Sequence, residues 1–340
     1  MPPIVDRHFE VPKQHEDFCV FDSGIEDPER VLIFGDRDNI QSLILHRDVW
    51  LCDGTFKVCP IQFYQLYTIH IQLAGFYPPC IYALLPNKTE HTYKKLLKGL
   101  SAITENHEPH RILLDFERAA LNAFASHHTG ALLKGCYFHL CQAFNRKINE
   151  VGLKRLYETN HDLNLSLRLI PALSFVPVEM VNAAFDLVIE EIENVSDKFD
   201  LDDNITQKLD EVASYFQRTY IKGETIGRNS REPLFPVNLW NHSEEAAAGL
   251  IRTTNAVEGW HLGVATLFKG NHPSVHTFLE QIKLDAANQK FNIMKAMGGN
   301  SNPSRKKYRE LNEKVKNICN NFNKDSILTY LYSLAQLSHS

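Results

Sequence analysis

The sequence lacks the cysteine pairs and the long apolar runs that mark disulfide-stabilised or membrane-spanning proteins. Its 7 cysteines among 340 residues are odd in number and scattered, and no two form a Cys-x-x-Cys pair, which fits a reducing compartment. No stretch approaches the roughly 20 apolar residues of a membrane span. Residues 1–30 also lack the apolar core of a secretory signal. These absences predict an intracellular protein without a membrane segment.

Several common enzyme motifs are also missing. The chain has no Gly-x-Ser-x-Gly, no Walker or Rossmann glycine pattern and no His-Glu-x-x-His. Its net charge of -5 gives no global basic field of the kind that neutralises nucleic-acid phosphates. This argues only weakly against DNA binding, because a nuclease gathers acidic residues in its site and can bind DNA through local basic patches.

The hydrophobic pattern predicts an α/β protein. Residues 1–30 show no period and are expected to form an N-terminal tail. Within 31–152, strand-like runs at 49–58, 63–73 and 80–85 are separated by short connections, which makes them antiparallel neighbours. A helix capped by Thr89 follows, then a strand at 112–114, a helix near 119–124, a strand at 132–138 and a helix at 140–151. This order predicts a mixed sheet flanked by helices.

Strand signals almost vanish between residues 153 and 250, which are expected to form an all-α insertion. Its helices need a partner surface because they carry apolar stripes, one at Val181, Ala184, Phe185, Val188, Ile189 and Ile192 and another near Leu209, Val212, Ala213, Phe216 and Tyr220. Residues 251–297 return to two strong helices. A break at Gly298 and Gly299 precedes a C-terminal helical tail at 298–340.

Three carboxylates stand where a catalytic metal site needs them. Asp53 follows a strand run, Asp115 follows the apolar residues 112–114, and Glu258 opens a helix. Like charges 4 Å apart repel by about 4 kcal/mol at an effective dielectric of 20, so three acids gather only around cations. Each acid also has a structural alternative: a turn or Asx-cap for Asp53, a helix N-cap for Asp115, and a capping box with Asn255 for Glu258.

A second group of candidates is formed by Cys136, His139 and Cys141. They could be half of a zinc site, although a structural zinc needs four ligands and no second pair is obvious. A role for His139 in contacting a substrate phosphate or a site carboxylate is favoured, and core packing is the alternative for the cysteines. Candidate phosphate contacts are Lys57, Lys134, Arg146, Lys147, Lys154, Arg155 and Arg252.

Six motifs in order resemble the Mutator-like (MULE) transposase domain over residues 31–282. They are Asp53-Gly-Thr-Phe-Lys57 after Trp50, Gln65-Leu-Tyr-Thr-Ile-His70, Tyr82-Ala-Leu-Leu-Pro-Asn-Lys-Thr89, Leu114-Asp-Phe-Glu117, Gly135-Cys-Tyr-Phe-His139 and Asn255-Ala-Val-Glu-Gly-Trp-His261. The resemblance implies a DDE, ribonuclease-H-like core with a five-stranded mixed sheet, and a helical insertion before the last acidic residue.

The resemblance also implies the chemistry. Asp53, Asp115 and Glu258 match the family's metal-binding acids, which hold two Mg²⁺ or Mn²⁺ ions, and Cys136 with His139 matches its Cys-x-x-His signature. The accessory residues implied around Glu258 are Asn255, Trp260 and His261, while Lys57, Arg146, Lys147 and Arg252 stay as candidate DNA contacts. The implied partners are transposon terminal inverted repeats, target DNA and a second copy of the chain, and the implied location is the nucleus.

Members of this family usually carry a DNA-binding module, often a FLYWCH-type zinc finger, ahead of the catalytic domain. Residues 1–30 are too short for one, and Thr253-Thr254 stands where Thr-Asn is expected. The alternative to an active transposase is therefore a truncated or host-recruited derivative that is catalytically silent and acts by binding DNA or proteins.

Overall fold

A computed structural model describes residues 7–226, 229–302 and 306–337. Contacts between Cα atoms divide the chain into two units, each built from two segments. Unit 1 comprises Met1–Leu133 and Thr254–Ser304, and unit 2 comprises Lys134–Thr253 and Arg305–Ser340. The helical insertion and the C-terminal helices therefore share one unit, whereas the helix that carries Glu258 returns to the other.

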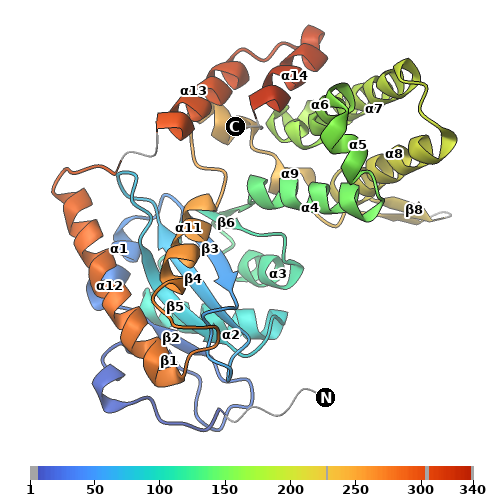
Figure 1. The fold of residues 1–340 in the computed structure, drawn as a ribbon. Helices are drawn as coiled ribbons and strands as arrows, with labels where there is room; N and C mark the ends of the chain where they lie inside the picture. Colours follow the sequence, from blue (N-terminus) through green and yellow to red (C-terminus); the bar gives the residue numbers. More distant parts are fainter. Residues whose placement is uncertain (1–6, 227–228, 303–305, 338–340) are drawn as a thin grey trace. The chain divides into compact units, whose positions relative to one another are not determined.

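A mixed seven-stranded sheet organises unit 1 (Figure 1), which confirms the predicted mixed α/β class but has two more strands than the five expected. Its strand order is β1-β2-β5-β4-β3-β6-β7. The strands are β1 (Cys19–Asp22), β2 (Leu32–Phe34), β3 (Trp50–Thr55), β4 (Gln65–Ile71), β5 (Pro79–Leu85), β6 (Arg111–Leu114) and β7 (Leu132–Gly135). As predicted, β3, β4 and β5 are antiparallel neighbours. Strand β6 runs parallel to β3.

Helices cover both faces of this sheet. Successive strand residues point to opposite faces, and in β4 the ring of Tyr67 contacts Tyr93 and Phe124, whereas Thr68 faces His261. One face is therefore covered by α2 (Glu90–Ile103) and α3 (Arg118–His127). The other is covered by α11 (Asn255–Ala265) and α12 (Val275–Met297), with α1 (Arg37–Leu45) beside α12 (Figure 1). Every residue of β4 and β5 is buried between these layers.

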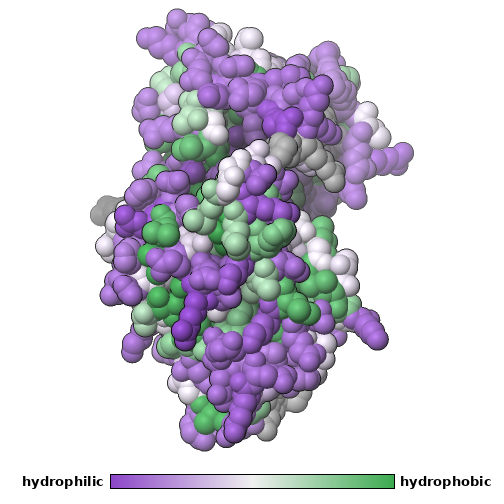
Figure 2. All heavy atoms as spheres, turned by 90° about the vertical axis from the view of Figure 1, so that its left-hand side faces the viewer, coloured by the Kyte–Doolittle hydropathy of each residue, from purple (hydrophilic) through white to green (hydrophobic). Residues whose placement is uncertain are grey.

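Helix α12 buries one side against the rest of unit 1 and exposes apolar side chains on the other. Figure 2 views the face of unit 1 that carries this helix, and it shows apolar groups scattered among hydrophilic ones. The exposed apolar residues of α12 are Leu284, Phe291, Met294 and Met297. No helix in the described ranges combines the length and the apolar character needed to cross a membrane.

Unit 2 is mainly helical. Its helices are α4 (Tyr137–Glu150), α5 (Lys154–Thr159), α6 (His161–Ala172), α7 (Val181–Lys198), α8 (Asp203–Phe216), α9 (Val237–Trp240), α10 (Ser243–Ala248), α13 (Lys306–Asn320) and α14 (Ile327–Leu337). A short hairpin of β8 (Glu224–Ile226) and β9 (Asn229–Arg231) interrupts them. The predicted stripe of α7 is buried at Val181, Ala184, Phe185, Val188 and Ile192.

Two local predictions were wrong. The stretch 1–30 was expected to hold no regular element, yet Cys19–Asp22 forms β1 and pairs with β2. The strand expected at 132–138 ends at Gly135, and Tyr137 already opens α4. Here the Tyr137 N–H donates to the Arg252 carbonyl at 3.0 Å, so the backbone leaves the sheet earlier than the apolar pattern indicates.

Candidate metal centre

The first two candidate acids lie on neighbouring strands, Asp53 in the second half of β3 and Asp115 directly after β6. Parallel pairing sets Trp50 opposite Ile112 and Leu51 opposite Leu113. The same register continued by two residues brings Asp53 level with Asp115. Both acids thus stand at the carboxyl ends of parallel strands, where ligand sites of open α/β sheets usually occur.

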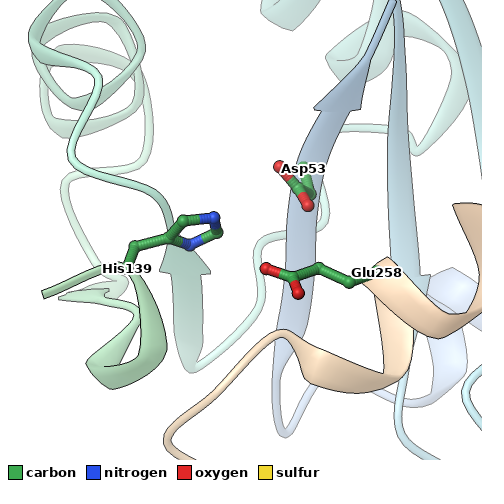
Figure 3. A group of neighbouring side chains, drawn as sticks. All are labelled: Asp53, His139 and Glu258. Carbon is green, nitrogen blue, oxygen red and sulfur yellow. The ribbon is translucent and has the colours of Figure 1, made fainter. Parts of the chain in front are cut away.

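Glu258 approaches Asp53 from the α11 side of the sheet. The two carboxylates point toward one another from α11 and β3 (Figure 3). An oxygen of each lies within 4.8 Å of the other, a separation that a shared cation can bridge. Helix α11 reaches this position because it packs on β3, with Val257 and Val264 buried.

The alternatives for Asp115 and Glu258, a helix N-cap and a capping box with Asn255, are not formed in the structure. Helix α3 begins at Arg118 with Glu117 at its N-cap, so Asp115 does not cap it. Helix α11 has Thr254 at its N-cap and no side-chain cap bond, so the Asn255–Glu258 capping box is not formed. Asp53 does accept a hydrogen bond from the Gly54 N–H at 2.8 Å, which engages one of its two oxygens.

Burial raises the pKa of all three acids, and like charge adds to this shift at Asp53 and Asp115. Burial, then the Asp115 carboxylate and Glu258, raise the pKa of Asp53 to about 7, against the opposing effects of the Gly54 N–H and Lys88. Burial and the charge of Glu117 raise the pKa of Asp115 to about 6. Burial also raises the pKa of Glu258. Since a divalent cation would favour the ionised forms, the Asp53–Glu258 pair, with Asp115 near enough to raise the pKa of Asp53, fits a bound cation.

A row of buried, hydrogen-bonded polar side chains leads from β4 to Asp53. The His70 ring is fully buried, which lowers its pKa to about 3. Its Nδ1 lies 2.9 Å from the Tyr77 carbonyl and therefore carries the proton, so Nε2 accepts from the Thr68 hydroxyl at 3.0 Å.

The same row of polar side chains orients His261. The Thr68 oxygen lies 3.5 Å from His261 Nε2, and His261 Nδ1 lies 3.6 Å from Asp53 Oδ2. Burial lowers the pKa of His261 to about 4, so the ring is neutral near pH 7. The Nδ1 edge of the ring faces the second Asp53 oxygen. Sequence reasoning noted His261 but missed Thr68 and His70, although polar residues two apart in a buried strand were a usable signal.

Two further residues stand beside the acids and were not predicted as site residues. Glu117 accepts from Lys88 Nζ at 2.6 Å and from the Tyr93 hydroxyl at 2.7 Å. Lys88 is close enough to oppose the raised pKa values of both Asp53 and Asp115. Both residues lie within the quoted motifs, and the Asp-x-Glu spacing of Asp115 and Glu117 was the available signal.

The Cys-x-x-His segment belongs to unit 2. Cys136 is the N-cap residue of α4 and His139 lies in its first turn. The preceding Gly135 carbonyl accepts from His242 Nε2 at 2.8 Å. Within the described ranges, no group of three or more metal-ligand side chains includes Cys136 or Cys141, so no zinc site is assembled around the two cysteines there.

The candidate phosphate contacts have different surroundings. Lys57 and Arg146 are exposed, and Lys147 pairs with Glu211 at 2.6 Å. Arg252 is 9% exposed and donates to Asn312 at 2.9 Å, so it is held inside unit 2 rather than presented to solvent. Lys134 is likewise buried, with Nζ 3.1 Å from Glu245.

Comparison with known families bears on this arrangement. The family model of the MULE transposase domain matches residues 49–143. This match confirms the resemblance found in the motifs, and it spans β3 to α4, including Asp53, Asp115 and the Cys136–His139 segment. A MULE transposase domain implies a transposase family, which in general depends on divalent metal and acts on DNA. No curated protein matches the chain.

Proposed function

We propose that this chain is the catalytic domain of a DDE-type transposase that cuts and joins DNA at transposon ends. The observation that supports the proposal is that Asp53 has a further acid on each side in unit 1. Asp115 directly follows the strand that pairs with β3 and raises the pKa of Asp53, and an oxygen of Glu258 lies within 4.8 Å of one of Asp53. The neighbouring order β5-β4-β3-β6-β7 supports a ribonuclease-H-like core with β1 and β2 added at one edge.

Asp53, Asp115 and Glu258 would hold two Mg²⁺ or Mn²⁺ ions. Bound in this way, the ions would activate the attacking oxygen and stabilise the leaving oxygen of an in-line phosphoryl displacement. The acids supply hard oxygen ligands from two strand ends and one helix, so their spacing is set by the sheet and by the packing of α11.

The neighbouring side chains of this domain orient those ligands. His261 lies against Asp53 and is itself held through Thr68 and His70. Trp260 fixes α11 by donating to Asp285 at 3.1 Å. Asn255 is the first residue of the same helix. Lys57 and Arg146 are exposed cations that we propose contact the DNA backbone.

The substrate would be DNA bearing terminal inverted repeats, followed by target DNA. Strand transfer at two transposon ends favours a homo-oligomer, and we propose a nuclear location from the resemblance to the transposase family. These assignments rest on the transposase family and on the acidic site.

The test is Mn²⁺- or Mg²⁺-dependent nicking and strand transfer on DNA that carries candidate inverted repeats. Wild type should form products that Asp53→Asn, Asp115→Asn and Glu258→Gln do not form. The matched control is Asp48→Asn, because the Asp48 side chain in the same unit is 93% exposed and stands apart from the site. Equal activity of Asp53→Asn and wild type would refute the assignment.

A further inference from the structure

Two aromatic rings are left in solvent in the loop that follows β3. Phe56 is 40% exposed and Tyr64 is 53% exposed. Their ring centroids lie 5.4 Å apart at an interplanar angle of 70°. Large apolar rings gain free energy from burial, and the same loop buries Val58, Cys59 and Phe63. The two exposed rings are therefore a feature of the loop and not a consequence of its being loosely packed.

The loop is held at both ends and in the middle. The Tyr64 N–H donates to the Leu85 carbonyl at 2.8 Å, which ties the end of the loop to β5. The carbonyl of Lys57 accepts from the His272 N–H at 2.8 Å, and that of Cys59 lies 3.0 Å from His272 Nδ1. Because the backbone is fixed, the rings are presented with little conformational freedom left to lose on binding.

A lysine stands over one of these rings. Lys88 Nζ lies 4.7 Å from the centroid of Phe56 and donates to Glu117 at 2.6 Å. An ammonium group has three N–H donors, so this bond to Glu117 leaves further donors for a ligand.

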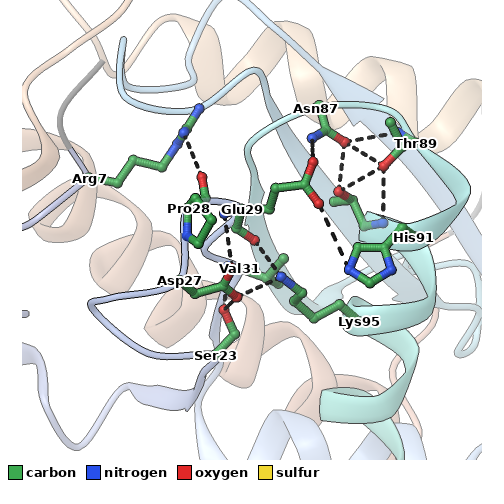
Figure 4. Close-up of polar contacts among 11 residues, drawn as sticks. Arg7, Ser23, Asp27, Pro28, Glu29, Val31, Asn87, Thr89, His91 and Lys95 are labelled. Atoms are coloured by element: carbon green, nitrogen blue, oxygen red, sulfur yellow. Dashed lines mark hydrogen bonds and ion pairs between the residues drawn. The ribbon is translucent and has the colours of Figure 1, made fainter. Parts of the chain in front are cut away.

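The neighbours of Lys88 are held by hydrogen bonds, of which Figure 4 shows those of Asn87, Thr89 and Lys95. Asn87 Oδ1 accepts from the Thr89 N–H at 3.0 Å and from the Thr92 hydroxyl at 2.6 Å. Asn87 Nδ2 donates to Glu29 at 2.8 Å. Lys95, one turn further along α2, donates to Asp27 at 2.6 Å. The backbone of Lys88 is thus held by its neighbours, and 32% of its side chain is exposed.

Phe56 and Glu117, the partner of Lys88, both lie shortly after a candidate acid in the sequence. Phe56 is the first residue after β3 and lies three residues beyond Asp53, and Glu117 lies two residues beyond Asp115, which follows β6. A strand of nucleic acid whose phosphate enters an acidic site is repelled by the carboxylates around it. A fixed cation next to exposed aromatic rings is the combination that binds unpaired nucleotides, since the rings stack on bases of any sequence and the cation contacts the backbone.

We propose that Phe56, Tyr64 and Lys88 bind an unpaired nucleotide of the DNA strand processed at the Asp53–Asp115 site. The base stacks on the face of one of the two rings and meets the other edge-on, since the ring planes stand 70° apart, and its phosphate contacts the Lys88 ammonium. This inference rests on the proposed function, because it takes the acidic site as the place where the strand reacts. It adds a substrate feature: the preferred DNA end is frayed or single-stranded and not fully paired.

The experiment compares a fluorescein-labelled DNA duplex that has a single-stranded tail with a blunt duplex of the same sequence. Binding is measured by fluorescence anisotropy in Ca²⁺ at fixed salt for the full chain and for Phe56→Ala, Tyr64→Ala and Lys88→Ala. A stacking contact contributes about a tenfold change in affinity per base or more. Phe56→Ala and Tyr64→Ala should therefore bind the tailed DNA about tenfold more weakly and the blunt DNA as wild type does.

Lys88→Ala should weaken binding to the tailed DNA and lower the slope of log affinity against log salt by about one, the signature of one lost phosphate contact. The matched control is Phe291→Ala on α12. Phe291 is 58% exposed and its ring centroid lies 4.3 Å from Lys295 Nζ, so it repeats the ring and the cation away from the acids. This control should bind both DNAs as wild type does, and Phe56→Tyr should restore binding to the tailed DNA.

Three outcomes would overturn the inference. Phe56→Ala and Tyr64→Ala could bind the tailed DNA as tightly as wild type. They could lose affinity equally for tailed and blunt DNA, which would indicate a duplex surface. They could instead change the sedimentation of the protein without DNA, which would indicate that a second copy covers the rings. Thermal melts of each variant exclude loss of fold as the cause.

The same samples separate this inference from the proposed function. If Asp53→Asn nicks DNA as wild type does while Phe56→Ala loses its preference for the tailed DNA, the catalytic assignment fails and the nucleotide surface stands. If Asp53→Asn is inactive while Phe56→Ala binds both DNAs as wild type does, the catalytic assignment stands and the nucleotide surface fails.

Discussion

Trp260 Nε1 donates a hydrogen bond to Asp285 Oδ2 at 3.1 Å, and the same Asp285 oxygen accepts from the Tyr82 hydroxyl at 2.8 Å. One buried carboxylate therefore joins α11, α12 and β5. Glu258 lies two residues before Trp260 in α11. The bond consequently fixes the rotation of the helix that presents Glu258 to Asp53.

Asp285→Ala is expected to destabilise the protein by about 2–5 kcal/mol, because the buried Tyr82 hydroxyl and the half-buried Trp260 N–H lose their acceptor at roughly 1–3 kcal/mol each. Urea unfolding measures the loss. Gln289→Ala is the control, since Gln289 donates to the other Asp285 oxygen at 3.0 Å from the same helix and its removal leaves the Trp260 and Tyr82 bonds in place. Equal stability of Asp285→Ala and Gln289→Ala would show that the carboxylate does not secure α11.

Much of unit 1 could be predicted from sequence, because its strands are short apolar runs with short connections. The antiparallel order of β3, β4 and β5 follows from those connections, and Thr89 caps α2 as expected, with its side chain accepting from the Thr92 N–H. Strand β1 was missed because the pattern of Cys19–Asp22 is only partly apolar and its residues are half-buried or exposed. Its pairing depends on β2, which a local pattern does not reveal.

The positions of two of the three candidate acids could be predicted from the predicted strands. Asp53 and Asp115 interrupt apolar runs, so their positions follow from the strands, and their level pairing follows from parallel register. Glu258 needed the resemblance, since a glutamate at the start of a helix is ordinary. The contacts of Lys88 with Glu117 and of Asp285 with Trp260 join segments far apart in the chain, and no local pattern predicts such pairs.

Gly54→Ala tests the packing under the site. A Cβ at Gly54 would lie 2.5 Å from Gln65 Oε1, and Gln65 is fully buried with its Nε2 bound to the Tyr93 hydroxyl at 2.8 Å. The side chain has little room to move, so overpacking should cost about 1–3 kcal/mol. Gly263→Ala in α11 is the control, because nothing lies within 4 Å of a Cβ there. Thermal denaturation should show a lower Tm for Gly54→Ala alone, and an unchanged Tm would contradict the packing argument.

His261→Ala tests whether this ring orients Asp53. Removing it leaves the Thr68 hydroxyl and one Asp53 oxygen without their neighbour, and loss of a residue that orients a metal ligand typically weakens metal affinity by about 10–100-fold. Isothermal titration with Mn²⁺ measures this change. His276→Ala is the control, since the His276 side chain is 57% exposed at the start of α12. An unchanged Mn²⁺ affinity in His261→Ala would rule out an orienting role.

The raised pKa values of the acids predict how the free energy of unfolding depends on pH in the absence of metal. The pKa of Asp53 is about 7 in the folded protein against 3.8 for the ordinary group, and that of Asp115 is about 6. Between about pH 4 and 7 the folded state therefore binds more protons than the unfolded state, so the free energy of unfolding falls as pH rises through this window. At about 1.4 kcal/mol per pKa unit, Asp53 alone accounts for up to roughly 4 kcal/mol.

Asp53→Asn should remove this penalty, and should therefore be more stable than wild type at pH 8 in EDTA while differing little at pH 4. Mn²⁺ should reverse the order at pH 8, because the ion stabilises wild type by binding the ionised acids and Asp53→Asn lacks one of them. Urea unfolding at both pH values, with and without Mn²⁺, gives the comparison. Asp48→Asn should follow wild type throughout, since its side chain is 93% exposed. If Asp53→Asn and wild type gain the same stability from Mn²⁺, Asp53 is not a metal ligand.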